Sequence, residues 1–208
     1  MKDTKYHSLF FQAIGLLKAV PEKDPLLGWV INLDGIKHRL FIPPRLYRNW
    51  LKQINSHDIA PLYLRVYPRA YMIKKQEPSI FFQVVAWQDE NNKNEAINVF
   101  TIKGIWQFIP QSRLPVLSIY RNIKSNDFTM RYKATHLPII MRRDDCQPYR
   151  FLSNKSAKEV TRYFVQSEFI YLPDRQAFKY KGDIAAPVTK IPRHKKPVKV
   201  QEEKAVPQ

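Results

Sequence analysis

Short apolar runs separated by turns divide the first half of the chain into segments of strand length. Asp34-Gly35 separates two of these runs and is a strong hairpin signal, because both turn positions favour a positive φ. Between two later runs the apolar residues change to helical spacing and form one stripe, made of Leu46, Trp50, Leu51 and Ile54. The pattern predicts three strands, a helix and two strands, at residues 9–20, 27–33, 36–42, 43–54, 61–72 and 80–87.

The first of these runs occurs a second time, 89 residues further along the chain. Residues 10–22 align without a gap on residues 99–111. The aligned pairs include Phe11 with Phe100, Gly15 with Gly104 and Pro21 with Pro110. A glycine inside a strand usually marks a bulge or a bend, and we expect the proline to end the hydrogen-bonded ladder. A repeat of this kind indicates two similar units. The alternative is that two β-rich segments match through composition alone.

The second half is less regular after the repeated strand. We expect strands at residues 99–109, 114–121, 128–133, 137–141, 149–152 and 163–172, with an edge strand at 176–180. A helical turn is expected at residues 154–159, but no apolar stripe like that of residues 43–54 follows the third strand, so its connection would be altered. Residues 187–208 contain four prolines and six basic residues and can bury almost nothing, so we expect a disordered tail.

The order of elements in residues 9–88, with a glycine inside the first strand, resembles the OB-fold. This fold is a five-stranded Greek-key barrel, and the resemblance implies a helix between its third and fourth strands. A different small barrel is the structural alternative. We therefore expect an all-β chain with a minor helix, built as two OB-like five-stranded Greek-key barrels in tandem. The expected domains are residues 1–90, residues 91–186 and the tail 187–208. At the level of fold the chain resembles tandem OB-fold proteins that bind single-stranded nucleic acid.

The formal net charge of +17 indicates a polyanionic partner. The excess is spread over the chain, with +5 in residues 1–95, +8 in 96–186 and +4 in 187–208. Nucleic acid is the first candidate. An anionic membrane surface ranks last, because no basic amphipathic helix with a broad apolar face is present, and no run of 18 apolar residues predicts a transmembrane helix. Charge for solubility alone is the other interpretation.

The residues that usually carry chemistry form no recognisable site. Cys146 is the only cysteine, which excludes an internal disulfide and a cysteine-based zinc site and fits a reducing, cytoplasmic compartment. The five histidines have no metal-ligand spacing, and Asp144 and Asp145 are adjacent, so on a strand they would point to opposite faces. No phosphate-cradling glycine loop or hydrolase motif occurs. We expect no enzyme activity, no cofactor and no metal.

The segment 61–72 carries the most informative surface. On a strand, alternate residues share a face. One face would carry Leu62, Leu64, Val66, Ala70 and Met72 toward a core. The other would carry Tyr63, Arg65, Tyr67, Arg69 and Tyr71. Rings can stack on unpaired bases and arginines can bind phosphates, which favours single-stranded nucleic acid. Pro68 indicates an edge strand or a bulge. The alternative is a half-buried strand whose tyrosines lie under the tail or against the other domain.

Further aromatic and basic residues could extend this surface, although for any one of them a solvated or buried position is favoured over a binding role. They are Trp29, Lys37, Arg39, Tyr120, Arg121, Arg131, Lys133, Arg142 and Arg143. The sequence thus predicts a non-enzymatic protein that binds single-stranded RNA or DNA, with a slight preference for RNA. The alternative is an adaptor or assembly factor that binds another protein through a barrel edge and the C-terminal tail, within a ribonucleoprotein for example.

Overall fold

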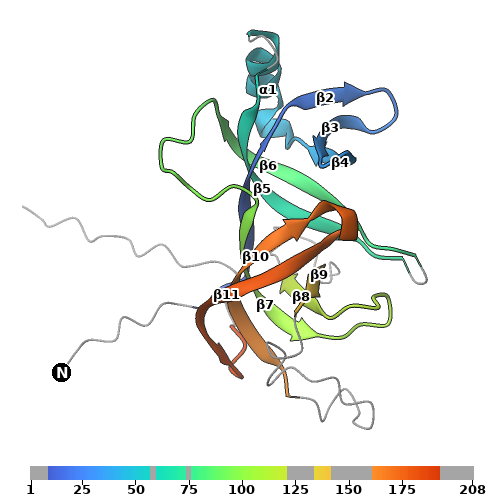
Figure 1. The fold of residues 1–208 in the computed structure, drawn as a ribbon, viewed down its shortest axis with the longest axis vertical. Coiled ribbons are helices and arrows are strands. Elements are labelled where there is room, and N and C mark those ends of the chain that lie inside the picture. Colours follow the sequence, from blue (N-terminus) through green and yellow to red (C-terminus); the bar gives the residue numbers. More distant parts are fainter. Residues whose placement is uncertain (1–8, 57–59, 74–75, 121–133, 142–160, 193–208) are drawn as a thin grey trace, which may run out of the picture.

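The computed structural model describes residues 9–56, 60–73, 76–120, 134–141 and 161–192 (Figure 1). These residues form eleven strands, one α-helix and a short 3-10 helix at Pro173–Arg175. The elements of the first half are β1 (Gln12–Ala19), β2 (Pro21–Asp24), β3 (Gly28–Leu33), β4 (Ile36–Phe41), α1 (Pro44–Ser56), β5 (Leu62–Tyr71) and β6 (Ser79–Gln88). Those of the second half are β7 (Val99–Gln107), β8 (Val116–Tyr120), β9 (Ala134–Ile140), β10 (Tyr163–Leu172) and β11 (Ala177–Val188).

The strands of the first half close into a barrel. β2 pairs with β3, and β3 pairs with β4, both antiparallel. β4 then pairs in parallel with β6, β6 pairs antiparallel with β5, and β5 pairs antiparallel with β1. Because β1 and β2 are consecutive and separated by Val20 alone, they act as one bent first strand that joins both ends of the sheet. This five-stranded closure, with α1 between the third and fourth strands, is the OB-like barrel that the element order predicted.

The strands of the second half repeat the same set of pairings. β7 pairs with β8, β8 with β9, β10 with β11 and β10 with β7, all antiparallel. β11 pairs in parallel with β9, as β6 does with β4. The prediction of two OB-like barrels is therefore confirmed, and the repeated stretch forms the first strand of each. The expected strands and helical turn at 128–133, 149–152 and 154–159 lie outside the described residues.

Two local expectations need correction. Pro21 does not end the ladder, because it opens β2 and pairs with Ile31. The chain changes partner there, from β5 to β3. The expected edge strand at 176–180 is the longer β11, which closes the second barrel and continues to Val188, two residues into the segment predicted as tail. Residues 193–208 lie outside the described part. The domain boundaries at residues 90 and 186 remain a proposal, and residue 90 falls between β6 and β7.

The Asp34-Gly35 turn has the geometry that the sequence predicted. The φ angles are 51° at Asp34 and 83° at Gly35, and the turn joins β3 to β4 with Leu33 opposite Ile36. Both positive angles match the two-residue hairpin turn whose twist suits the flanking strands. The turn therefore fixes the register of the hairpin, and with it the side on which each residue of β4 lies.

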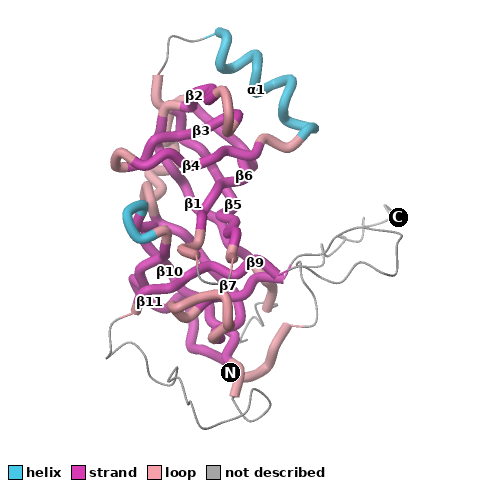
Figure 2. The backbone as a smooth tube through the Cα atoms, turned by 90° about the vertical axis from the view of Figure 1, so that its right-hand side faces the viewer, coloured by secondary structure: helices cyan, strands magenta, loops and turns pink. Residues whose placement is uncertain are grey.

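The barrels are joined through their equivalent first strands, β1 and β7. Gln12 lies opposite Lys103, Ala13 opposite Ile102 and Ile14 opposite Thr101. In the repeat, Gln12 corresponds to Thr101 and Ile14 to Lys103, so the pairing is symmetric about Ala13 and Ile102. This is the arrangement of a two-fold interface, in which residue i meets residue j and j meets i. Figures 1 and 2 show the two barrels stacked end to end along this joint.

Gly15 is required at this joint for a reason that the sequence pattern did not reveal. It pairs with Val66 of β5 and also with Phe100 of β7, and neither ladder has a register shift there. A Cβ atom at Gly15 would lie 2.4 Å from the Phe100 ring. The expected bulge is therefore absent, and the glycine instead makes room for a ring that lies across it. Phe100 is fully buried and packs against Phe178, which belongs to the core of the second barrel.

One apolar core runs through both barrels. Phe82 of the first barrel contacts Tyr171 of the second edge to face, with ring centroids 5.3 Å apart. At the far end of the first barrel, Trp50 of α1 is fully buried between Trp29 and Trp87. The helix thus covers that end of the barrel, in line with its predicted apolar stripe. Rings of this size contribute much of the buried apolar area, so the barrels stabilise one another.

Candidate nucleic-acid interface

Strand β5 has the two faces that its sequence predicted. Leu62, Leu64 and Val66 are buried, whereas Tyr63, Arg65, Tyr67 and Arg69 are half-buried and Tyr71 is 55% exposed. Pro68 is buried and lies opposite Phe82 of β6. The pairing of β5 with β1 ends at Val66, so the missing N–H of Pro68 costs no hydrogen bond to β1. Ala70 and Met72 differ from the expectation, because both are only half-buried where the hairpin projects from the barrel.

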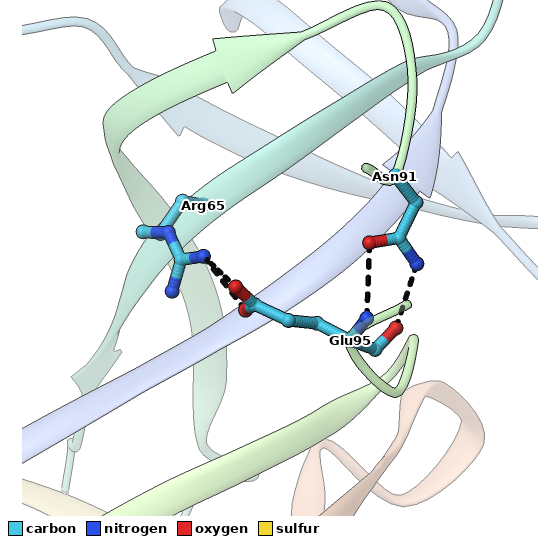
Figure 3. Close-up of polar contacts among 3 residues, drawn as sticks. All are labelled: Arg65, Asn91 and Glu95. Carbon is cyan, nitrogen blue, oxygen red and sulfur yellow. Dashed lines mark hydrogen bonds and ion pairs between the residues drawn. The ribbon is translucent and has the colours of Figure 1, made fainter. Parts of the chain in front are cut away.

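The charged groups on this outward face already have partners within the chain. The Lys18 ammonium lies 5.2 Å from the centre of the Tyr63 ring. Arg65 donates through Nη2 to both carboxylate oxygens of Glu95, at 2.6 and 2.7 Å (Figure 3). Glu95 lies in the segment between β6 and β7, so this ion pair holds that segment against β5. The predicted phosphate contact at Arg65 would have to share or displace this carboxylate.

Arg69 connects the two barrels. It donates to Gln83 Oε1 at 2.8 Å and to Thr135 Oγ1, on β9 of the second barrel, at 3.2 Å. Burial lowers the pKa of the guanidinium, although its ordinary value is so high that the group stays charged. The geometry gives Arg69 a structural role between the barrels that the sequence did not indicate. Its predicted contact with phosphate stays a prediction.

Tyr71 belongs to an open stacking platform. Its ring lies parallel to that of Phe81 on β6, with centroids 4.7 Å apart and an interplanar angle of 18°. On the neighbouring strand β4, Phe41 lies opposite Gln83 and is 42% exposed. Arg39, just before the paired stretch, is exposed on the same side of β4 as Phe41. Arg39, Phe41, Phe81, Tyr67 and Tyr71 thus form one surface across three strands, which we call the aromatic–basic face.

The structure separates the remaining predicted residues into three groups. Trp29 is half-buried against Trp50, and Tyr120 packs edge to face on Phe11, so both contribute to the core. Lys37 is exposed on β4 next to this face, where it pairs with Asp24 at 3.1 Å. The others lie outside the described residues, namely Arg121, Arg131, Lys133, Arg142 and Arg143.

Sequence reasoning missed Phe41 and Phe81, although a signal was present. Lys37, Arg39 and Phe41 alternate with His38, Leu40 and Ile42, which are all buried. Likewise Phe81 and Gln83 alternate with the buried Ile80, Phe82 and Val84. The alternation of polar or aromatic residues with buried apolar ones therefore indicated the outward face of each strand. The parallel pairing of β4 with β6, which brings the two faces together, joins segments about 40 residues apart and left no mark in the local pattern.

The second barrel does not repeat this face. The outward residues of β10, the counterpart of β5, include Gln166, Glu168 and Ile170. Glu168 forms an ion pair with Lys181 of β11 at 2.9 Å. Glu168 thus places a carboxylate on the outward side of β10, whereas the outward side of β5 carries arginines and tyrosines. The described strand β10 therefore lacks the outward arginines and tyrosines of β5.

The described residues offer neither a cluster of metal ligands nor a membrane-spanning helix. They contain no group of three or more histidine, cysteine, aspartate or glutamate side chains that could hold a metal ion. They also contain no helix long and apolar enough to cross a membrane.

No protein-family model matches the chain, and no curated protein matches its sequence. Among solved structures, the chain is similar to a deletion mutant of the single-stranded DNA binding protein from Thermus aquaticus. The two share 12% sequence identity, the match covers 86% of this chain and 92% of that chain, and the TM-score is 0.42. The assignment of both barrels stands on their strand pairings.

Proposed function

We propose that this protein binds single-stranded nucleic acid on the aromatic–basic face of its first barrel, without catalysing a reaction. The observation that carries the proposal is the stack of the exposed Tyr71 on the half-buried Phe81, with the exposed Arg39 and Phe41 on the outward side of the neighbouring strand β4. A base can continue such a stack, and a stacked base contributes about 1–3 kcal/mol. OB-folds use the face of their second and third strands and the loop between the fourth and fifth to bind oligonucleotides. Here those parts are β3, β4 and the β5–β6 hairpin.

Electrostatics supports the same surface. Arg39 is exposed, and within the described residues it has neither a hydrogen bond nor an ion pair, so its guanidinium is available for a phosphate. The net charge of +17 would add a long-range attraction for any polyanion. Stacking then distinguishes single strands, whose bases are exposed, from duplexes, whose bases are not. The aromatic–basic face has no feature that distinguishes RNA from DNA, so we propose single strands of either kind as ligands.

The test is the binding of fluorescent oligonucleotides of about 16 nucleotides, the upper end of the range for one OB-fold. Single-stranded DNA, single-stranded RNA and a duplex are compared at several salt concentrations by fluorescence anisotropy. We expect both single strands to bind better than the duplex, with affinity that falls as salt rises. Absence of binding to both single strands at low salt would remove the proposal.

A matched pair of tyrosine variants locates the site. Tyr71→Ala should weaken binding by about 5- to 150-fold, the equivalent of one lost stacked base. Tyr47→Ala removes a ring of similar exposure, 40%, from helix α1 and should leave the affinity unchanged. Equal effects of the two substitutions would place the binding surface elsewhere. Arg39→Gln should lower the salt dependence by about 0.7 in the slope of log K against log salt, as one phosphate contact is lost.

A further inference from the structure

The Arg65–Glu95 ion pair offers a carboxylate to a side chain that the proposed function would use for phosphate. Both side chains are about one-third exposed, at 34% and 32%. Both carboxylate oxygens bind the same nitrogen, Nη2. Within the described residues, no hydrogen bond occupies Nη1 or Nε of Arg65. The guanidinium therefore keeps donors that the ion pair does not use, while a negative charge already lies against it (Figure 3).

The turn that presents Glu95 is built by Asn91. The Asn91 side chain donates to the Glu95 carbonyl oxygen at 2.8 Å and accepts from the Glu95 backbone N–H at 3.0 Å. Both bonds use the backbone of Glu95 and leave its carboxylate free to reach Arg65. The turn thus places the carboxylate over β5 and does not depend on the carboxylate for its own shape.

The segment that holds this turn is anchored on either side of it. Asp89 accepts a hydrogen bond from Gln53 of α1 at 2.9 Å. On the other side, the backbone N–H of Asn98 donates to the carbonyl oxygen of Leu16 at 2.7 Å, and Leu16 is the cross-strand partner of Arg65. Removing the Arg65–Glu95 contact would therefore leave the segment attached at both anchors. The ion pair is a separate feature of the segment and not its only attachment.

Arg65 shares the outward side of β5 with Tyr67 and Tyr71. Strands rise about 3.3 Å per residue, so Arg65 lies about 20 Å from Tyr71 along the strand. A single strand of several nucleotides that stacks at Tyr71 can extend this far, because one OB-fold covers about 4–16 nucleotides. A phosphate at Arg65 would then meet the Glu95 carboxylate.

We propose that Glu95 is an intrachain competitor for phosphate at Arg65, and this inference rests on the proposed function. Carboxylate and phosphate oxygens bind a guanidinium in the same way. A partly exposed ion pair contributes little to stability, so a phosphate of a correctly stacked strand can replace the carboxylate. A polyanion that lacks exposed bases gains no stacking energy to offset this competition. Competition from Glu95 would therefore weaken binding to polyanions without exposed bases more than it weakens binding to a stacked single strand.

The experiment compares Glu95→Gln with Glu90→Gln in the full chain. Both variants remove one negative charge from the same segment, but Glu90 is exposed and has no contact with Arg65. We expect Glu95→Gln to bind a single-stranded oligonucleotide about five- to tenfold more tightly than Glu90→Gln at low salt. Its salt slope should be steeper by about 0.7, because one more phosphate is neutralised. Thermal unfolding of each variant verifies that the fold is retained.

A double-mutant cycle separates competition from simple charge repulsion. When Arg65 is also replaced by Gln, the competitor has no target, so Glu95→Gln and Glu90→Gln should become equivalent. If the advantage of Glu95→Gln persists without Arg65, or never appears, the competitor proposal is wrong while the binding function stands. If the unaltered protein binds no single strand, the proposed function itself falls. Should Glu95→Gln fail to fold, Asn91→Ala releases the same carboxylate and should shift affinity in the same direction.

Discussion

Replacing Gly15 with alanine tests the joint between the barrels. The added Cβ would lie 2.4, 2.6 and 2.7 Å from three carbons of the Phe100 ring. Carbon atoms pack at about 3.5–4.0 Å, so the ring or the strand must move by about 1 Å. Phe100 is fully buried and contacts Phe82, Tyr171 and Phe178, which leaves the ring little room to move.

The expected loss of stability follows from two opposing effects. Overpacking a well-filled core costs about 1–3 kcal/mol, and this contact falls toward the upper end. Alanine in place of glycine returns about 0.4–1 kcal/mol by restricting the unfolded chain. We therefore expect Gly15→Ala to lower the free energy of unfolding by about 2 kcal/mol, a fall of about 4–8 °C in Tm for a chain of this length. Gly182→Ala is the matched control, because a Cβ there meets nothing within 4 Å.

Urea unfolding followed by tryptophan fluorescence measures both variants. Gly182→Ala should match or slightly exceed the unaltered protein, and Gly15→Ala should unfold at clearly lower urea. Adding Phe100→Leu should cost less in the Gly15→Ala chain than in the unaltered one, because the smaller side chain relieves the clash. If Gly15→Ala were as stable as Gly182→Ala, the close approach of the ring to β1 would be refuted.

Two further predictions concern stability. Burial lowers the pKa of His38 and His136, so the unfolded chain binds more protons below about pH 6.5. Their contribution is fully present above that pH and is lost as pH falls toward the folded pKa values. The urea midpoint should therefore drop between pH 7.5 and pH 5.5, and the drop should shrink when both are replaced by Gln. Arg69→Gln should lower the free energy of unfolding by about 1–3 kcal/mol, because the hydrogen bonds of Arg69 to Gln83 and Thr135 are lost. Lys52→Gln removes the same charge from an exposed position of α1 and should leave the free energy of unfolding unchanged.

The sequence predicted those parts of the fold that are governed by neighbouring residues. The Asp34-Gly35 turn, the α1 stripe and the two faces of β5 all follow from local periodicity or turn chemistry. The repeat between residues 10–22 and 99–111 correctly indicated two equivalent first strands. The pairing of these strands with each other could not be read in the same way, because each first strand could equally have faced solvent.

The candidate site was predicted in part, for the same reason. Tyr71 and Arg39 were identified from their own strands, but the platform needs Phe81 and Phe41, which only the β4–β6 pairing brings into place. The partner of Arg65 was missed because Glu95 lies in the polar segment 89–95, which has neither strand nor helix periodicity. Contacts between residues distant in sequence decide which charges are available, and single-sequence patterns carry little information on such contacts.

The most direct test of the central claim is to find where a bound strand touches the protein. An oligonucleotide carrying photoreactive 5-iodouracil is bound at low salt, irradiated, and its attachment sites are identified by mass spectrometry. We predict attachment at Tyr71, Phe81 or Phe41 of the first barrel. Attachment confined to helix α1 or to the strands of the second barrel would contradict the account.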